Sequence, residues 1–202
     1  MSEYGKLFAA IYDPVVYPFL THIRKHTAQI IKQTNAKKII DLCCGTGNQL
    51  KHLKKNGLTD IIGIDISPFM IEKARKGKIT VECELKDATN TEFPSNTFDL
   101  AMVSFALHEM PWQNAEKIIN EAFRIIKPGG FFLAIDYCIT SKPSVLGRIG
   151  RNLIERLAGK EHYNNYKYFI KHGGLAELLK QKKLIKQSLF LFKAVAVNLY
   201  QK

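Results

Sequence analysis

With 202 residues, 46% of them hydrophobic, the chain is long enough for a single domain with a full core. It contains no apolar run long enough to span a membrane, and its N-terminus lacks the basic and apolar regions of a signal peptide. We therefore expect a cytoplasmic protein. The net charge of +12 favours anionic partners, although lysines scattered over the surface would give the same sum.

The four cysteines do not indicate a metal centre or a disulfide framework. Cys43, Cys44, Cys83 and Cys138 include no C-x-x-C pair, and two of them lie on predicted strands. We expect reduced, buried thiols and no metal site.

The first 35 residues precede the first predicted strand. Aromatic side chains recur over residues 1–17, and the apolar residues from Phe19 to Ile31 have an irregular helical spacing. This pattern predicts an N-terminal helical segment over residues 1–35.

A short strand and a glycine-rich turn follow in Lys38-Ile-Ile-Asp-Leu-Cys-Cys-Gly-Thr-Gly-Asn-Gln-Leu50. Gly45 and Gly47 let the backbone turn tightly and let a ligand approach main-chain N–H groups. Residues 48–55 are predicted to start a helix, and the N–H groups at a helix N-terminus favour a carboxylate or phosphate.

The second predicted strand, within residues 60–67, ends in the acidic Asp65. Because the first two strands of a doubly wound sheet are neighbours, this carboxylate can accept hydrogen bonds from the ribose hydroxyls of an adenosine ligand. Ile66 would then lie beside the adenine. Ser67 and Pro68 are typical of a helix start.

The middle of the chain continues to alternate strands and helices. Lys78 to Leu85 alternates apolar and polar residues, and Phe98 to Ser104 is apolar enough for the centre of a sheet. Residues 104–110 follow the latter strand, at the end where ligands of open α/β sheets sit. His108 is the titratable side chain there with a pKa suited to general-base catalysis, although it could equally be a loop histidine that only caps or packs.

The last third of the chain completes a predicted seven-stranded sheet. Ala115 to Ile126 reads as an amphipathic helix, and Lys127-Pro-Gly-Gly130 as a turn into a fifth strand at Phe131 to Tyr137. We expect a helix over Gly173 to Lys183 and strands over Gln187 to Lys193 and Ala194 to Tyr200.

A basic amphipathic segment, residues 140–172, interrupts this pattern. Seven lysines and arginines stand there against Glu155 and Glu161, interleaved with aliphatic and aromatic residues. Such a segment suits an anionic membrane surface, an anionic substrate or a lid, and equally a surface helix packed on its own domain.

Four stretches in order resemble the motifs of the class I S-adenosylmethionine-dependent methyltransferases: Asp41-x-x-x-Gly45-x-Gly47, Ile61-Ile-Gly-Ile-Asp65-Ile-Ser67, Phe98-Asp99-Leu-Ala-Met-Val-Ser104 and Arg124-Ile-Ile-Lys-Pro-Gly-Gly130. The chain looks distantly similar to the quinone C-methyltransferases and phospholipid N-methyltransferases. The family usually has glycine where Cys43 stands, so that side chain should point away from the ligand.

The resemblance implies an α/β fold, a Rossmann-like doubly wound sheet that is mostly parallel with one antiparallel strand in a C-terminal hairpin. It implies a single domain: a lid at residues 1–35, a cofactor-binding core at 36–139, the insertion at 140–172, and the last helix and hairpin at 173–202. The cofactor S-adenosyl-L-methionine, with S-adenosyl-L-homocysteine as its product, would contact Asp41, Cys43, Gly45, Thr46, Gly47, Asp65, Ile66, Met70, Asp87, Ala88, Ser104 and Phe105. Tyr4, Tyr12 and His108 would face the methyl acceptor, a small or lipid-like molecule that attacks the methyl group in line.

Two other functions are weighed against methyl transfer. A dinucleotide-dependent dehydrogenase would need a third glycine where Leu50 stands. A basic, non-catalytic protein that binds nucleic acid or a membrane could keep the fold. The nucleic-acid reading is the weaker one, because Ser104-Phe-Ala-Leu107 replaces the Asn-Pro-Pro-Tyr-type motif of the family's base-modifying members.

Overall fold

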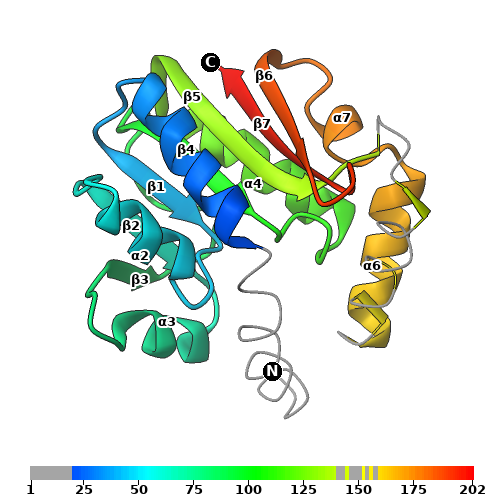
Figure 1. Cartoon of the computed structure of the whole chain (residues 1–202), viewed down its shortest axis with the longest axis horizontal. Helices are drawn as coiled ribbons and strands as arrows, with labels where there is room; N and C mark the ends of the chain where they lie inside the picture. Colours follow the sequence, from blue (N-terminus) through cyan, green and yellow to red (C-terminus); the bar gives the residue numbers. More distant parts are fainter. Residues whose placement is uncertain (1–19, 140–143, 146–151, 153–154, 157–158) are drawn as a thin grey trace.

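The structure, a computed structural model, describes residues 20–139, 144–145, 152, 155–156 and 159–202. Tyr4 and Tyr12 lie outside these residues, as does much of the 140–158 part of the basic segment. A helix covers residues 20–33, and the other elements are β1 (Ile39–Leu42), α2 (Asn48–Lys55), β2 (Ile61–Asp65), α3 (Pro68–Arg75), β3 (Glu82–Leu85), β4 (Phe98–Ser104), α4 (Trp112–Ile125), β5 (Ile126–Tyr137), α6 (Lys160–Lys171), α7 (Gly174–Leu178), β6 (Lys183–Phe190) and β7 (Val195–Gln201) (Figure 1).

The strands form one seven-stranded sheet in the order β3-β2-β1-β4-β5-β7-β6. The pairs from β3 to β5 are parallel, and β7 runs antiparallel to both of its neighbours. The predicted fold class is therefore confirmed, including the antiparallel strand in the C-terminal hairpin. Strand order reverses between β1 and β4, and the carboxyl ends of parallel strands at such a switch point form the ligand-binding crevice of open α/β sheets.

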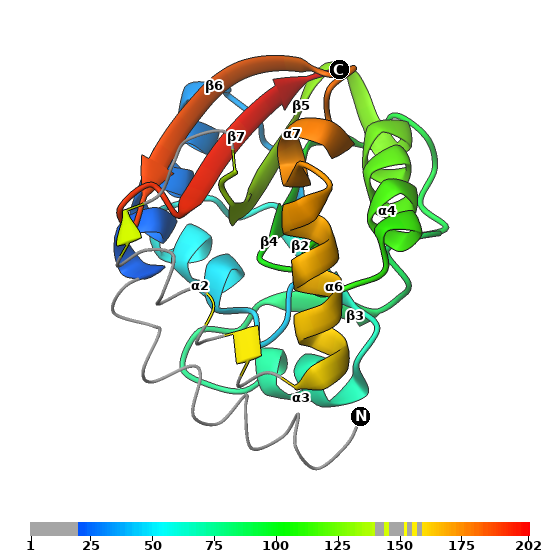
Figure 2. The same ribbon diagram turned by 90° about the vertical axis from the view of Figure 1, so that its right-hand side faces the viewer.

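Helices cover both faces of this sheet (Figures 1 and 2). One apolar cluster joins helix 20–33, α2 and α3 to one face, and a second joins α4 and α7 to the other. Successive side chains of β1 point to opposite faces of the sheet, since Ile39 belongs to the first cluster and Ile40 to the second. Both faces of the strand are buried, so its apolar residues Ile39, Ile40 and Leu42 do not alternate with exposed polar ones.

In the first half of the chain, α2 and α3 begin where the sequence predicts. α2 spans the predicted residues, and α3 begins after Ser67, whose side chain accepts a hydrogen bond from the backbone N–H of Met70. Pro68 occupies the first helical position, where its missing N–H costs nothing.

Several predicted boundaries were wrong. The third strand is shorter than expected, because only residues 82–85 pair with β2. The last helix ends at Leu178 instead of Lys183, and β6 starts at Lys183 because its pairing with β7 extends to that residue. β5 begins at Ile126, but residues 127–130 are looped out between two of its pairings with β4, so the predicted turn survives as a bulge.

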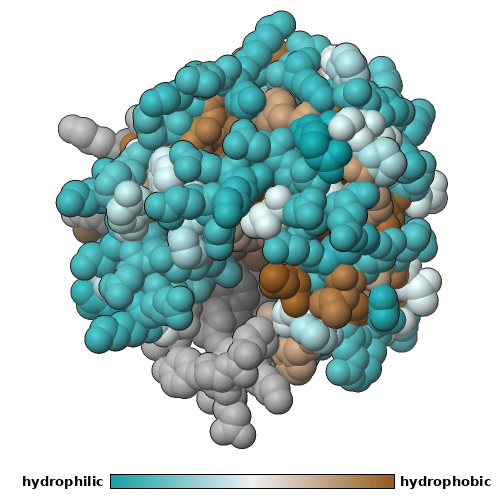
Figure 3. Space-filling view, turned by 180° about the vertical axis from the view of Figure 1, so that it is seen from behind, coloured by the Kyte–Doolittle hydropathy of each residue, from teal (hydrophilic) through white to brown (hydrophobic). Residues whose placement is uncertain are grey.

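The face seen from behind is largely hydrophilic (Figure 3). Among the described residues no helix is long and apolar enough to cross a membrane. Between β1 and β4, two large apolar side chains are exposed. They are Ile66, at 70%, and Leu85, at 54%, and they lie at the carboxyl ends of β2 and β3.

A buried carboxylate fixes α4 to the loop before β4. Glu121 accepts hydrogen bonds from the backbone N–H and the hydroxyl of Thr91, and Arg124 binds both of its oxygens at 2.7 Å. The Arg124 guanidinium and the Thr91 donors lower the pKa of Glu121 from 4.5 to about 2. The folded state therefore favours the ionised form of the Glu121 carboxyl group.

We predict that Glu121→Gln lowers the free energy of unfolding near neutral pH by about 1–3 kcal/mol, because hydrogen bonds to a charged acceptor are lost. A pKa lowered in the folded state stabilises the protein above the unfolded value, and this contribution disappears as the pH falls from 4.5 towards 2. The difference between wild type and variant in urea unfolding should therefore shrink over that range. Glu116→Gln, an exposed site on the same helix, is the control and should show no such difference.

Candidate cofactor and acceptor site

The loop between β1 and α2 supplies a cradle at the switch point. Gly45 adopts a left-handed conformation with φ of +55°, and a Cβ there would meet no atom within 4 Å. Gly47 is also left-handed, at φ of +71°, but a Cβ on it would lie 3.1 Å from the Ala74 side chain. The first glycine therefore leaves open space for a ligand, and the second lets α3 approach the loop.

Asp65 ties the end of β2 to this loop. Its Oδ2 accepts a hydrogen bond from the Gly45 N–H at 2.9 Å, and its Oδ1 accepts from the Ser67 N–H at 2.9 Å. Burial raises the pKa of Asp65, and these two donors oppose part of that shift. Each carboxylate oxygen can accept a second hydrogen bond, so the group remains able to bind a pair of ribose hydroxyls.

Two further polar groups at the carboxyl ends of β1 and β4 lack partners. Asp41 is 1% exposed, and its Oδ1 has no hydrogen-bond donor among the described residues. The hydroxyl of Ser104 is likewise buried without a partner in the described part of the chain. Burial raises the pKa of Asp41 well above its usual range. Unpaired buried polar atoms are costly, so a bound group that supplies donors here would be favoured.

The predicted adenine contacts lie at the ends of β2 and β3. The Asp87 Oδ1 accepts the Thr89 N–H at 2.8 Å, which fixes the turn that carries buried Ala88. Ile66, largely exposed, follows Asp65 and offers an apolar surface of the kind a flat base covers. The residues predicted to hold the ribose and the adenine thus stand at or just after the carboxyl ends of two adjacent strands.

Cys43 shows why its position favours glycine. Its φ is +63°, a left-handed conformation that costs a residue with a Cβ roughly 1–2 kcal/mol. The side chain packs against the apolar cluster on the α4 face. Burial raises the pKa of the thiol far above its usual value, so Cys43 stays a protonated, inert thiol.

His108, four residues after β4, is almost fully buried at 2% exposed. Its Nδ1–H donates to the Asp136 Oδ1 at 2.7 Å, and its backbone N–H reaches the Asp136 Oδ2 at 3.3 Å. The Nε2 atom lies 3.5 Å from the Glu155 Oε2. Burial alone would lower the pKa of His108, but Asp136 and Glu155 outweigh it and raise the pKa well above 6.5.

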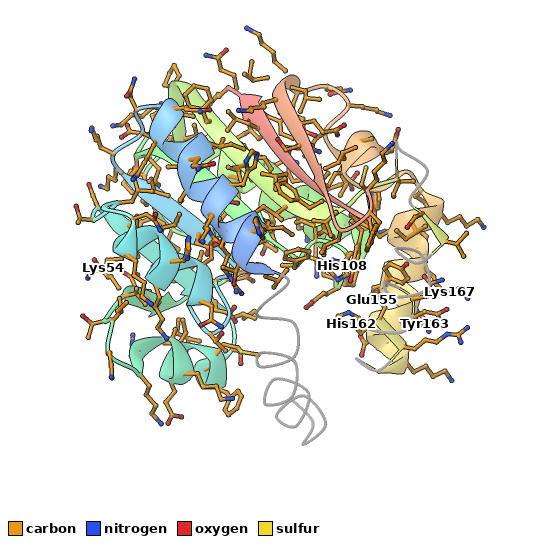
Figure 4. All side chains as sticks on the ribbon, in the orientation of Figure 1. Lys54, His108, Glu155, His162, Tyr163 and Lys167 are labelled. Carbon is orange, nitrogen blue, oxygen red and sulfur yellow. The ribbon has the colours of Figure 1, made fainter. Side chains whose placement is uncertain are left out.

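Glu155 joins three other side chains to His108. Its Oε1 accepts the Tyr137 hydroxyl at 2.5 Å, and its Oε2 contacts the His162 Nε2 at 2.5 Å. Burial would raise the pKa of Glu155, but the hydrogen bonds from His108, His162 and Tyr137 lower it well below 4.5. Figure 4 shows His108 facing Glu155 and His162 on the side of α6. The sequence pointed to His108 but to none of its partners.

Most of the predicted site residues fall into two groups. Asp41, Gly45 and Asp65 stand at the carboxyl ends of β1 and β2 and on the loop between β1 and α2, whereas Ser104 ends β4 and Phe105 and His108 follow it. Phe105 is left-handed at φ of +52° and packs edge-on against Tyr137, with ring centroids 6.4 Å apart. Tyr4 and Tyr12, predicted to face the acceptor, lie outside the described residues.

Comparisons with known proteins bear on the family and the fold. Residues 39–130 match the family model described as a methyltransferase domain. This match supports the class I S-adenosylmethionine-dependent methyltransferases as the family that the chain resembles. The chain is 35% identical over 100 residues to an uncharacterized methyltransferase of Synechocystis, covering 50% of this chain and 47% of that one. It is 37% identical over 108 residues to a demethylmenaquinone methyltransferase of Leptospira interrogans, covering 48% and 42%.

A solved structure supports the fold over nearly the whole chain. The plantazolicin methyltransferase BpumL in complex with S-adenosylhomocysteine superposes with a TM-score of 0.68 at 16% identity, covering 98% of this chain and 90% of that one. The chain spans less than half the length of the two relatives named above.

The left-handed backbone at Cys43 predicts a specific order of stabilities. Cys43→Gly should be more stable than Cys43→Ala by about 1 kcal/mol, because both lose the sulfur contacts and only alanine keeps a Cβ at positive φ. Urea unfolding of the two variants measures the difference. Equal stabilities, or a more stable alanine variant, would contradict the strained conformation.

Proposed function

We propose that this protein transfers a methyl group from S-adenosyl-L-methionine to a small-molecule acceptor. The observation that carries the proposal is the loop at the switch point, where Gly45 is open to a ligand and Asp65 is hydrogen-bonded to it. The side-chain oxygens of Asp41 and Ser104 at the same edge of the sheet, which have no partner among the described residues, add to it.

Each part of the donor has a residue suited to hold it. Asp65 would accept from the ribose hydroxyls, and the turn at Asp87 and Ala88 would hold the adenine. The amino group of the methionine moiety would supply the donor that the Asp41 Oδ1 lacks, since an ammonium beside a buried carboxylate satisfies both groups. The sulfonium supplies an activated methyl group, so the protein has mainly to align an attacking atom with it.

The acceptor would approach from the side of Ser104 and His108. The network around His108 fixes the imidazole, because both ring nitrogens face carboxylates from other elements. We infer a quinone-like or lipid-like acceptor from the resemblance to quinone and phospholipid methyltransferases, and the Leptospira relative is named for the first of these. Contact of residues 140–172 with an anionic membrane stays a hypothesis, because most of residues 140–158 lie outside the described part.

The first test is isothermal titration with S-adenosylmethionine, S-adenosylhomocysteine and NAD. We predict binding of the first two and none of NAD. Asp65→Asn should weaken the binding at least tenfold, because it removes a charged hydrogen-bond acceptor while keeping the side chain's size. Asp60→Ala, an exposed acid just before β2, is the matched control and should bind as wild type does.

Thermal unfolding of each variant separates loss of binding from loss of folding. A folded Asp65→Asn variant with unchanged affinity would remove Asp65 from the ribose site. If the folded wild-type protein bound neither compound, and bound nucleic acid or anionic vesicles with a steep dependence on salt, the non-catalytic alternative would replace methyl transfer.

A further inference from the structure

The cluster around Glu155 has the composition of a metal site. His108, Glu155 and His162 each offer one donor atom, and the three atoms lie within 4.8 Å of one another. They come from the segment after β4, from residue 155 and from α6, so the fold itself brings them together. We propose that these three side chains bind a divalent transition-metal ion of the Zn²⁺ type.

The hydrogen bonds that these residues make to neighbouring side chains favour coordination of a metal ion. The carboxylate of Asp136 holds the Nδ1–H of His108 at 2.7 Å, which turns Nε2 towards Glu155. A metal-binding histidine typically has its other nitrogen hydrogen-bonded to a carboxylate in this way. The Tyr137 hydroxyl occupies the Glu155 Oε1, so Oε2 is the oxygen that faces both imidazoles.

Two of the three donor-to-donor distances can be compared with those of a zinc site, and the third, between the two imidazole nitrogens, is at most 4.8 Å. Bonds of about 2.0–2.2 Å from Zn²⁺ to nitrogen and oxygen place neighbouring donors roughly 3.3–3.5 Å apart in a tetrahedral site. The His108 Nε2 is already 3.5 Å from the Glu155 Oε2, and the His162 Nε2, at 2.5 Å, would move outwards by about 1 Å. His162 is the ligand able to move, since its side chain is 19% exposed whereas the other two are 3% exposed.

Charge also favours a cation. Asp136 and Glu155 are almost fully buried and carry two formal negative charges, one of which a proton on His108 offsets in the metal-free protein. An ion of charge +2 would displace that proton and offset both carboxylates. Two histidines and one carboxylate form the ligand set of catalytic zinc sites and of non-haem iron sites, in which a further position is open to water or substrate.

The proposed site differs from the expectation drawn from the sequence, which considered metal ligands only among the cysteines and expected no metal site. Its ligands are instead two histidines and a glutamate, 54 residues apart from first to last by their numbers. An ion there would stand on the acceptor side of the crevice, where it could hold an acceptor oxygen. That consequence rests on the proposed function, whereas metal binding itself does not.

The test is metal binding by the full-length, tag-free protein after dialysis against a chelator. Competition with a chromogenic chelator gives the stoichiometry and affinity for Zn²⁺, and Co²⁺ absorption reports the ligands. We expect one ion per chain and a visible Co²⁺ spectrum. His162→Ala and Glu155→Gln should each weaken Zn²⁺ binding at least 100-fold, since each removes a direct ligand.

His172→Ala is the matched control, because His172 is an exposed histidine just after the same helix. It should bind Zn²⁺ as wild type does. The melting temperature of wild type should rise with Zn²⁺, and that of folded His162→Ala should not, because an ion that binds only the folded state stabilises it.

Three results would overturn the site. They are no Zn²⁺ binding by wild type, unchanged affinity in folded His162→Ala, or a thiolate-to-cobalt charge-transfer band that shows cysteine ligands. Titration of the same preparations with S-adenosylmethionine keeps the two proposals apart. Cofactor binding without metal binding would remove only the metal site, and metal binding without cofactor binding would remove only the proposed methyl transfer.

Discussion

The pair of hydrogen bonds that Asp65 accepts is the interaction on which the crevice depends. One carboxylate, at the end of β2, binds the N–H of Gly45 and the N–H of Ser67. It therefore fixes the loop after β1 and the start of α3 at once. Because Gly47 lets Ala74 of α3 come within contact of the loop, the strand ends, the loop and the helix have one mutual arrangement. The same carboxylate that would hold the ligand thus also builds the place where the ligand would sit.

Most of the structure of the first half of the chain could be predicted from its sequence. Each signal there is local: Ile39 and Ile40 mark a buried strand, Gly45 marks a turn and Ser67 marks a helix cap. Local patterns of this kind predict an element before its distant contacts are known. The pairing of the first two strands was expected from the same alternation of strands and helices, because connections between parallel strands are constrained in hand and length.

The errors have a different origin. The start of β6 at Lys183 depends on its register with β7, and the length of β3 depends on how far it pairs with β2. Lys183 reads equally well as the end of a lysine-rich helix, so only the partner strand decides. Strand ends are set by partners that a single sequence does not display. The polar network of His108 was missed for the same reason, since Glu155 and Tyr137 carry no spacing signal relative to it.

That network is costly for a structure that needed only to pack. Two carboxylates and two imidazoles are withdrawn from water behind α6, and burying charges costs more than apolar side chains of similar volume would. The sheet is already complete without them, because the apolar clusters on both of its faces join the helices to it. Their convergence at the carboxyl end of β5 and beside Ser104 is what an acceptor site would require, where charges fixed in a dry environment act on a ligand more strongly than in water. The cluster is thus better explained by binding than by stability.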